Sequence, residues 1–304
     1  FFKFIFLIRN LPKYFLKSNF IIIDNLSTSR YSSLFNLDKK YKYKFMYSDV
    51  KKINLKKILK KEDVVIHLAA LTNAWESFRI PKIYKETNFS NTKFIVEACS
   101  KKKANLIFMS STSVYNTKKK VVDENCSVDE LKPDTPYSKI KLEEEKLIKF
   151  KSKKYNFNYL ILRLGTIAGV SPGMRFHTAV NKFCWQAVYN LPLTIWKNFI
   201  NVSKPYLDLK DLNLAMTFLI KNRKYNKTFN LVTNNLTTIE LVNIIKKFLP
   251  SLKITFEKKI DLKPNSFLVN NKNINDMHFK FKGNIKKRIF DTISLLKNSN
   301  NVKK

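Results

Sequence analysis

Short runs of β-branched and aromatic residues recur along the chain, and longer amphipathic segments that carry lysine and glutamate separate them. Each run is short and apolar, as expected of a strand buried on both faces of a parallel sheet. The four clearest runs are residues 20–23, 64–68, 106–109 and 159–162. The intervening segments predict helices over about 81–101 and 136–151, and Pro81 and Pro136 suit their first turns. This alternation predicts an α/β fold in which helices flank a parallel sheet.

The texture of the sequence changes after Gly165. Gly169-Val-Ser-Pro-Gly173 is the one cluster of glycine and proline, and such clusters mark loops. We therefore expect residues 1–168 to form the sheet domain and residues 169–304 to form mainly a second, smaller lobe. Segments near 206–232 are expected to return to the first domain. Two further helices are expected, near 238–248 and 284–297.

The chain has a formal net charge of +35, from 58 Lys and Arg against 23 Asp and Glu. An excess of this size raises the question of a nucleic-acid or anionic-membrane partner. The lysines are spread over nearly every polar segment and arginines are few, whereas nucleic-acid sites favour the planar fork of Arg. We therefore expect neither a nucleic-acid nor a membrane partner, although an anionic small molecule such as a nucleotide diphosphate would be attracted.

The cysteines and the opening residues bear on the compartment. Cys99, Cys126 and Cys184 are odd in number and lack Cys-x-x-Cys spacing, so the sequence predicts neither a disulfide framework nor a metal site. This favours a reducing cytoplasm. Residues 1–8 are apolar apart from Lys3 but are too few to span a bilayer.

The residues that carry chemistry lie in two segments. Ser110-Ser-Thr-Ser-Val-Tyr115 directly follows a predicted strand, and Pro136-Tyr-Ser-Lys-Ile-Lys141 opens a predicted helix. Tyr137 and Lys141 are four residues apart, so both side chains project from one helix face. A nearby ammonium lowers the pKa of a phenol, which suits it to proton transfer from an alcohol. The hydroxyl of Thr112 could position that alcohol, although Tyr-x-x-x-Lys alone is a weak match in a lysine-rich chain.

The order and spacing of three segments resemble one enzyme family. His-Leu-Ala-Ala at 67–70, Ser-Ser-Thr-Ser-Val-Tyr at 110–115 and Pro-Tyr-x-x-x-Lys at 136–141 are similar to the extended short-chain dehydrogenase/reductases of the nucleotide-sugar epimerase/dehydratase kind. The resemblance covers nearly the whole chain. It implies a Rossmann-type parallel sheet, NAD as cofactor, and a nucleotide-sugar substrate held under a smaller carboxy-terminal lobe. Relatives are often homodimers, so the resemblance also implies a possible homodimer.

The resemblance assigns candidate residues by motif. It implies that Tyr137 is the catalytic acid or base, that Lys141 binds the nicotinamide ribose and tunes the tyrosine, and that Thr112 is the third catalytic member. The acid at the end of the strand at 20–23 would bind the adenosine ribose, which favours NAD over NADP. The candidate cofactor-binding residues besides Tyr137 and Lys141 are Asp24, Asn25, Asp49, Val50, Leu68, Ala69, Ala70 and Asn88. The candidate substrate-binding residues are Thr72, Thr112, Thr166, Arg175, Asn181 and Lys204. No metal is expected.

One departure from the family pattern stands out. Relatives begin with a strand and a Gly-x-x-Gly-x-x-Gly loop whose backbone approaches the cofactor pyrophosphate. No glycine precedes Gly165 here, and residues 16–20 resemble only the end of the first helix. We therefore expect the first strand and the glycine loop to be missing, and cofactor affinity to fall sharply.

The sequence also bears on the reaction. Sugar 4,6-dehydratases of this family carry Asp-Glu after the catalytic threonine, whereas Ser113-Val114 follows Thr112 here. Dehydration is therefore disfavoured, and C4 epimerisation through a transient keto sugar is the leading hypothesis. An NAD(P)H-dependent reductase of the same family is the alternative enzyme. A non-catalytic relative that binds RNA is the alternative from another class, supported by the +35 charge and the missing loop.

Overall fold

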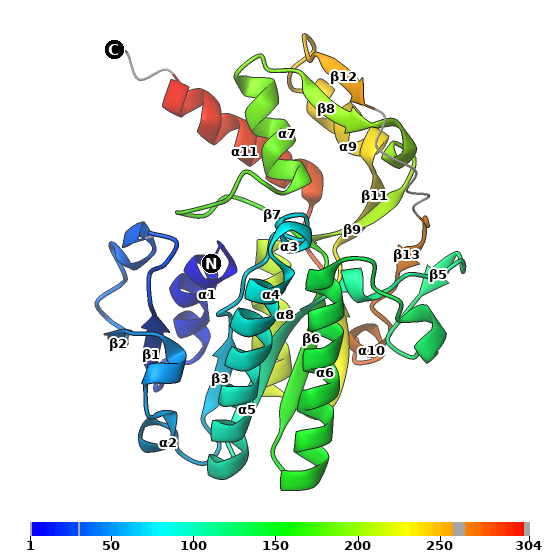
Figure 1. Cartoon of the computed structure of the whole chain (residues 1–304). Helices are drawn as coiled ribbons and strands as arrows, with labels where there is room; N and C mark the ends of the chain where they lie inside the picture. Colours follow the sequence, from blue (N-terminus) through cyan, green and yellow to red (C-terminus); the bar gives the residue numbers. More distant parts are fainter. Residues whose placement is uncertain (1, 30, 258–264, 301–304) are drawn as a thin grey trace.

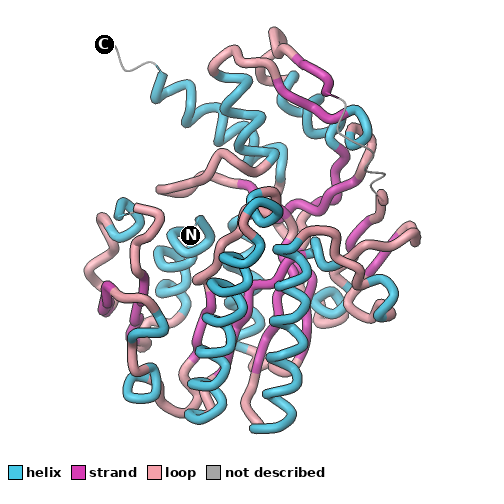
Figure 2. The backbone as a smooth tube through the Cα atoms, viewed as in Figure 1, coloured by secondary structure: helices cyan, strands magenta, loops and turns pink. Residues whose placement is uncertain are grey.

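The computed structural model describes residues 2–29, 31–257 and 265–300. Its main sheet is parallel, with the strand order β10–β6–β4–β3. These strands are β3 (Val64–His67), β4 (Asn105–Ser111), β6 (Tyr159–Leu164) and β10 (Lys227–Leu231). The main helices beside them are α5 (Ser90–Lys102), α6 (Pro136–Tyr155) and α8 (Leu209–Lys221). The predicted α/β class, with helices flanking a parallel sheet, is confirmed (Figures 1 and 2).

Two further parallel strands stand apart from the main sheet. β1 (Asn19–Asp24) pairs with β2 (Lys42–Tyr47), and at their carboxyl ends the Ser48 amide donates to the Asp24 carbonyl at 3.1 Å. In the part of the chain that the structure describes, no ladder joins either strand to β3.

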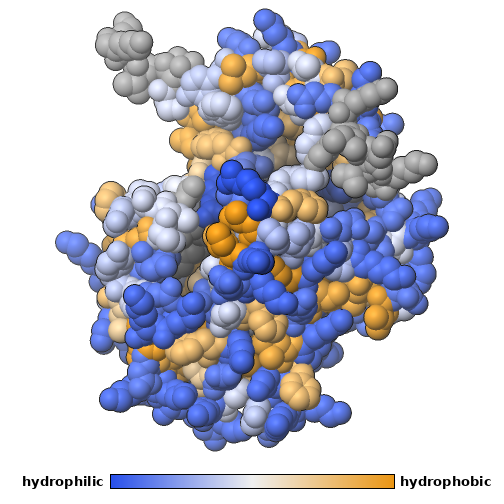
Figure 3. All heavy atoms as spheres, in the orientation of Figure 1, coloured by the Kyte–Doolittle hydropathy of each residue, from blue (hydrophilic) through white to orange (hydrophobic). Residues whose placement is uncertain are grey.

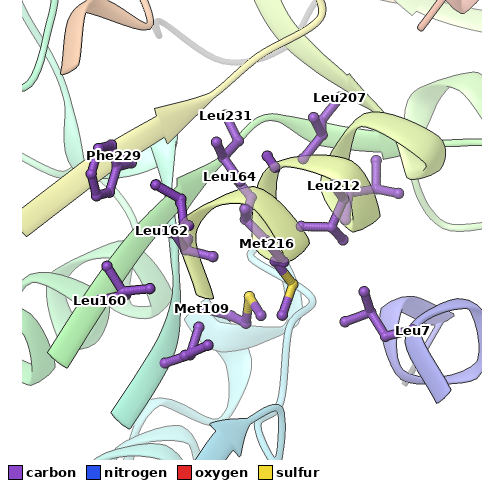
Figure 4. Close-up of a cluster of buried hydrophobic side chains, with 14 of the residues drawn as sticks. Leu7, Met109, Leu160, Leu162, Leu164, Leu207, Leu212, Met216, Phe229 and Leu231 are labelled. Atoms are coloured by element: carbon purple, nitrogen blue, oxygen red, sulfur yellow. The ribbon is translucent and has the colours of Figure 1, made fainter. Parts of the chain in front are cut away.

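The two faces of the main sheet are buried by different helices. Because successive side chains of a strand point to opposite faces, β4 contributes Ile107 and Met109 to one cluster and Leu106 and Phe108 to another. The first cluster also contains side chains of β6, β10, α8 and Leu7 of α1 (Phe2–Asn10), and Figure 4 shows these side chains converging. The second cluster contains side chains of α5 and α6. Each fully buried Leu, Ile or Phe contributes roughly 1.5–3 kcal/mol, so the two layers stabilise the lobe that holds the site.

The second lobe lies beyond the carboxyl end of the main sheet (Figure 1). Its helices are α7 (Ala179–Val188), α9 (Thr238–Lys246) and α11 (Ile285–Asn300), and its strands are β7 (Thr166–Ala168), β8 (Leu193–Trp196), β9 (Ser203–Asp208), β11 (Asn234–Thr237) and β12 (Ile254–Glu257). A separate hydrophobic cluster joins α7, α9 and α11. Of the segments expected to return, β10 enters the main sheet, whereas β9 pairs with β7 and β11 in the smaller lobe.

Shorter elements connect these parts. The short α-helices are α2 (Leu55–Ile58), α3 (Glu76–Arg79), α4 (Pro81–Tyr84) and α10 (Lys272–Asn275), and β5 (Val121–Val122) pairs with β13 (Leu268–Val269). The remaining short helical turns are η1 (Leu11–Tyr14), η2 (Tyr31–Leu34), η3 (Val50–Lys52), η4 (Lys85–Phe89), η5 (Thr112–Val114), η6 (Val128–Glu130) and η7 (Lys197–Phe199). Within the described ranges, no helix combines the length and the apolar composition that a bilayer span needs.

Two buried aspartates tie the start of α8 to the loop before α11. Asp208 caps α8 by accepting from the Lys210 amide at 2.8 Å, and it pairs with Arg288 Nε at 3.1 Å. Asp211 accepts from the Gly283 amide at 2.9 Å and from the Thr233 hydroxyl at 2.6 Å. These contacts place both carboxylates in a structural role, because they satisfy backbone donors that the loop would otherwise bury unpaired.

We expect the change Gly283→Ala to destabilise the protein. A Cβ at this position would lie 2.4 Å from Asp211 Oδ2 and 2.5 Å from Asp208 Cβ, so the loop or the α8 cap must shift. Overpacking of this kind costs about 1–3 kcal/mol. Urea unfolding of the variant measures the loss, and Lys286→Ala, at an exposed position of α11, is the control. Equal free energies of unfolding for the two variants would contradict the expectation.

Candidate active site

Tyr137 lies in the first turn of α6. Thr135 caps this helix by accepting from the Ser138 amide, and Pro136 occupies the first turn as predicted. The backbone amide of Tyr137 donates to the Ser77 hydroxyl at 3.1 Å. The tyrosine side chain packs against Tyr84, and only 7% of it is exposed. The backbone hydrogen bond to Ser77 and the packing of the ring against Tyr84 therefore both fix the position of the Tyr137 side chain.

Ser111, at the carboxyl end of β4, lowers the pKa of the Tyr137 phenol in part. Its hydroxyl accepts a hydrogen bond from the Ser113 hydroxyl at 2.8 Å. The Thr112 hydroxyl donates to the Leu164 carbonyl at 3.2 Å, and Thr112 is buried. Because the Thr112 hydroxyl is engaged by Leu164, Ser111 is the alternative to the predicted Thr112 as the third hydroxyl. Three consecutive hydroxyl residues fit the motif equally well, and a shift of one residue at a strand end turns the side chain to another face.

Lys141 sits one turn along α6, but a carboxylate holds its ammonium. Lys141 Nζ lies 3.0 Å from Glu144 Oε2 and 4.5 Å from the centre of the Phe108 ring. Glu144 Oε1 accepts from the Thr92 hydroxyl at 2.5 Å, and the same hydroxyl lies 2.9 Å from His67 Nε2. All of these groups are buried. Lys141, Glu144, Thr92 and His67 therefore form a continuous buried polar chain beside the tyrosine.

The electrostatics of this chain differ from the sequence prediction. An ammonium was expected to lower the pKa of Tyr137. Instead, burial raises the pKa of the phenol, the charges of Glu144 and Tyr84 raise it further, and Ser111 lowers it only in part. Burial and the charge of Lys141 lower the pKa of His67 to about 3, so this imidazole is neutral at physiological pH. The expected lowering is absent because burial, the largest cause, and the Glu144 carboxylate both oppose ionisation of the phenol.

The candidate residues for the adenosine end of the cofactor lie in the loops after β1 and β2. Asp24 is half-buried, and its carboxylate accepts from the Leu26 amide at 2.6 Å; burial raises its pKa. Asn25 is exposed and accepts from the Ser27 amide. Asp49 caps the turn that begins at Val50. Two acids at neighbouring strand ends fit a ribose diol and an adenine amine.

The loop after β3 is the candidate contact for the middle of the cofactor. Leu68, Ala69 and Ala70 form its first residues, of which Ala69 is exposed and the other two are half-buried. Asn88 is buried and its side-chain amide spans Leu71, donating to the Leu71 carbonyl at 2.9 Å and accepting from the Leu71 amide at 2.8 Å. Asn88 therefore fixes the backbone of this loop at Leu71.

One contact between candidate substrate residues joins the two lobes. Arg175 Nη1 donates to the Thr72 hydroxyl at 3.1 Å, which joins the loop after β7 to the loop after β3. Asn181 is buried in α7 and donates to the Arg175 carbonyl at 2.7 Å. Thr166 is half-buried at the start of β7. Lys204 lies 5.6 Å from the centre of the Phe199 ring, and burial lowers its pKa.

The sequence prediction missed a second buried polar group directly behind the site. Arg163 of β6 makes a bidentate pair with Glu145 of α6, with Nη2 2.7 Å from Oε2 and Nε 3.0 Å from Oε1. Its Nη1 donates to the Tyr115 hydroxyl at 2.8 Å, and Glu145 accepts from Ser110 at 2.6 Å. Glu145 lies four residues after Lys141, so the helical spacing that linked Tyr137 to Lys141 was the available signal.

Comparison with known proteins identifies the family. The family described as NAD dependent epimerase/dehydratase matches residues 6–231, about three quarters of the chain. The chain belongs to this family. This match confirms the predicted family, the extended short-chain dehydrogenase/reductases, and the Rossmann-type fold.

Individual relatives are more distant. A dTDP-D-glucose 4,6-dehydratase of Dictyostelium discoideum is 27% identical over 238 residues, which cover 74% of this chain and 54% of that protein. An uncharacterized UDP-glucose epimerase of Bacillus subtilis is 31% identical over 170 residues, 54% of this chain and 51% of that protein. The chain thus matches about half the length of these curated relatives.

Solved structures agree on the fold. The UDP-glucuronic acid 4-epimerase of Bacillus cereus, solved with UDP-glucuronic acid and NAD, superposes with a TM-score of 0.81 at 22% identity over 97% of this chain and 96% of that one. At this level of identity the likeness shows the fold.

Proposed function

We propose that this protein is an NAD-dependent nucleotide-sugar epimerase that inverts the C4 centre. The observation that carries the proposal is the place of Tyr137 in the first turn of α6, which lies against the end of β4 that carries Ser111, with Lys141 one helical turn away, in a chain of the epimerase/dehydratase family. A buried phenol next to a fixed hydroxyl can exchange a proton with a substrate alcohol. Both groups lie where β4 ends, the edge at which parallel sheets bind their ligands.

The described residues fit both ends of an NAD molecule. Asp24 and Asp49 present carboxylates for the adenosine end. At the nicotinamide end, Lys141 is the residue that would hold the ribose, and in this structure it is paired with Glu144. NAD, when bound there, would supply reversible hydride acceptance at C4 of the sugar. The pyrophosphate has no assigned residue, since no glycine precedes Gly165.

The chain's own residues move the proton and hold the sugar. Ser111 donates a hydrogen bond to the C4 oxygen and fixes its distance to Tyr137. Tyr137, in its ionised form, takes the proton of the C4 hydroxyl as the C–H bond breaks, and it gives the proton back to the same oxygen when that bond re-forms. Arg175 and Lys204 are the cations for the substrate diphosphate. The residues after Ser111 are Thr112 and Ser113, so the Asp-Glu pair associated with dehydration is absent from this register too.

The test is an assay with millimolar NAD and UDP-glucose or UDP-N-acetylglucosamine, in which chromatography detects the C4 epimer. We expect interconversion with no net change in NADH absorbance. Net oxidation of NADPH would favour the alternative reductase. Tight RNA binding that falls steeply with salt and survives Tyr137→Phe would favour the non-catalytic reading.

Cofactor affinity gives a second, independent measurement. We expect residues 1–304 by themselves to bind NAD weakly, as measured by calorimetry. Adding a strand and a Gly-x-x-Gly-x-x-Gly loop before Phe1 should tighten binding at least tenfold, because backbone amides would then cradle the pyrophosphate. No dinucleotide binding by either protein would contradict the enzyme proposal.

A further inference from the structure

The pairing of Lys141 with Glu144 has a consequence for the proposed reaction. A tyrosine can accept the proton of a sugar hydroxyl only after it has lost its own. A free ammonium nearby would favour that ionised form, and a nearby carboxylate disfavours it. In this chain the carboxylate and the ammonium are partners, 3.0 Å apart, with side chains that are 0% and 3% exposed.

Glu144 is held firmly in this position. Its Oε1 accepts from Thr92 of α5, and Thr92 in turn contacts His67 of β3, so two neighbouring elements fix the carboxylate. His67 is neutral because burial lowers its pKa to about 3, and it therefore brings no positive charge that would compete for Glu144. The remaining neighbour of the ammonium is the Phe108 ring of β4, whose face also attracts a cation. The ammonium thus has two attractive partners inside the protein.

We propose that Glu144 is a positioning residue that sequesters the Lys141 ammonium inside the protein and so restrains proton transfer by Tyr137. The inference rests on the proposed function for its biological meaning, since it concerns the same tyrosine. Its physical content does not depend on that function, because it concerns only the charges that face the phenol. Those charges and polar groups are Glu144 on α6, Tyr84 on α4 and Ser111 on β4.

The restraint acts in two ways. Glu144 neutralises the cation that would stabilise a phenolate, and it adds a negative charge that opposes one. Substituting Glu144 by Gln removes both effects and keeps the size of the side chain. Since an opposite charge within about 4–6 Å shifts a pKa by roughly 1–3 units, we expect Glu144→Gln to lower the pKa of Tyr137 by at least about one unit.

The experiment is a titration that needs neither cofactor nor substrate. The protein is labelled with ¹³C at the tyrosine ζ position, and the signal of Tyr137 among the 13 tyrosines is assigned as the one lost in Tyr137→Phe. The parent Tyr137 should stay neutral up to the highest pH at which the protein is folded, and the Glu144→Gln signal should titrate below that limit. Glu143→Gln is the matched control, because Glu143 is the adjacent residue and is exposed. An unchanged Tyr137 titration in folded Glu144→Gln would overturn the proposal.

A second variant covers the case in which Glu144→Gln leaves the buried ammonium unpaired and does not fold. The double variant Lys141→Met, Glu144→Gln buries neither charge. Its Tyr137 should titrate below the parent protein, because the carboxylate is gone, and above any folded Glu144→Gln, because the ammonium is gone as well. A Tyr137 that titrates no lower in the double variant than in the parent would equally overturn the proposal.

The outcomes separate this inference from the proposed function. A lowered Tyr137 pKa in a protein with no epimerase activity keeps the inference and removes the function. If the protein does epimerise a nucleotide sugar, Glu144→Gln should also move the basic half-maximum point of the rate downward in pH and raise the rate at pH 7 about tenfold. A purely structural role for Glu144 would lower stability without moving the pH profile.

Discussion

Replacing Tyr137 by Phe is expected to lower the epimerisation rate by about three orders of magnitude, because general acid–base catalysis by a positioned side chain contributes roughly 10²–10⁴-fold. The change removes only the hydroxyl oxygen that moves the proton. The ring, which packs against Tyr84, is kept. Nucleotide-sugar binding, measured by calorimetry, should change little, so the loss should appear in kcat rather than in KM.

Tyr155→Phe provides the control for this measurement. Tyr155 is the last residue of the same helix, 18 residues after Tyr137, and 40% of it is exposed. The same substitution there should leave the rate within about twofold of the parent protein, as surface changes away from a site usually do. A Tyr137→Phe protein with near-parental kcat would exclude Tyr137 as the proton-transfer group and with it the proposed mechanism.

The sequence predicted the main strands and helices because their periodicity is strong. The runs at 106–109 and 159–162 lie within β4 and β6, and Pro136 opens α6 as expected. These features depend on local pattern and on burial, which a single sequence records. The course of β9 was not predictable in the same way, because its partners β7 and β11 are chosen by tertiary packing.

In the candidate site, too, the sequence revealed what depends on local pattern and did not reveal what depends on tertiary packing. Tyr137 was found from its spacing to Lys141 and from its place at the start of a helix. The choice between Ser111 and Thr112 depends on how β4 ends in space, and the partner of Lys141 depends on which side chains meet in the interior. Glu144 lies in a run of three glutamates, Glu143 to Glu145, and nothing in the sequence distinguishes the three. The fold exposes the first and buries the other two, each against a different cation.

The basic composition also takes on a clearer meaning in the structure. Hydrophilic residues cover both lobes over much of the face in Figure 3, and hydrophobic residues lie between them. The Lys141 ammonium and the Arg163 guanidinium, by contrast, are buried against carboxylates. The chain has only 23 acidic residues against 58 basic ones, and two of the acidic residues pair with these buried cations next to the site.

The largest stability effect is expected for Arg163→Met. Arg163 is 2% exposed and joins β6 to α6 through Glu145 and to the turn after β4 through Tyr115, whose hydroxyl donates onward to Asn230 of β10. Removing the guanidinium leaves the Glu145 carboxylate buried, with the Ser110 hydroxyl as its remaining hydrogen-bond donor among residues 2–29, 31–257 and 265–300. Breaking a buried pair in this way costs about 3–5 kcal/mol, measured as the change in free energy of unfolding in urea.

Two comparisons test whether the pair itself is responsible. Arg223→Met removes a guanidinium that lies 3.7 Å from Glu62 with both side chains more than half exposed, and it should cost less than about 1 kcal/mol. The double variant Arg163→Met, Glu145→Leu removes both buried charges, so most of the lost stability should return, because apolar residues of similar size often replace a buried pair without cost. Ser110 and Glu145, which contact each other, are the sequence neighbours of the site residues Ser111 and Glu144. The activity of the double variant therefore shows whether the buried pair affects the site as well as the stability of the protein. If Arg163 and Glu145 serve only to hold β4 against α6, the double variant should recover stability and epimerisation together; stability without activity would mean that the charges of this pair act on the site itself.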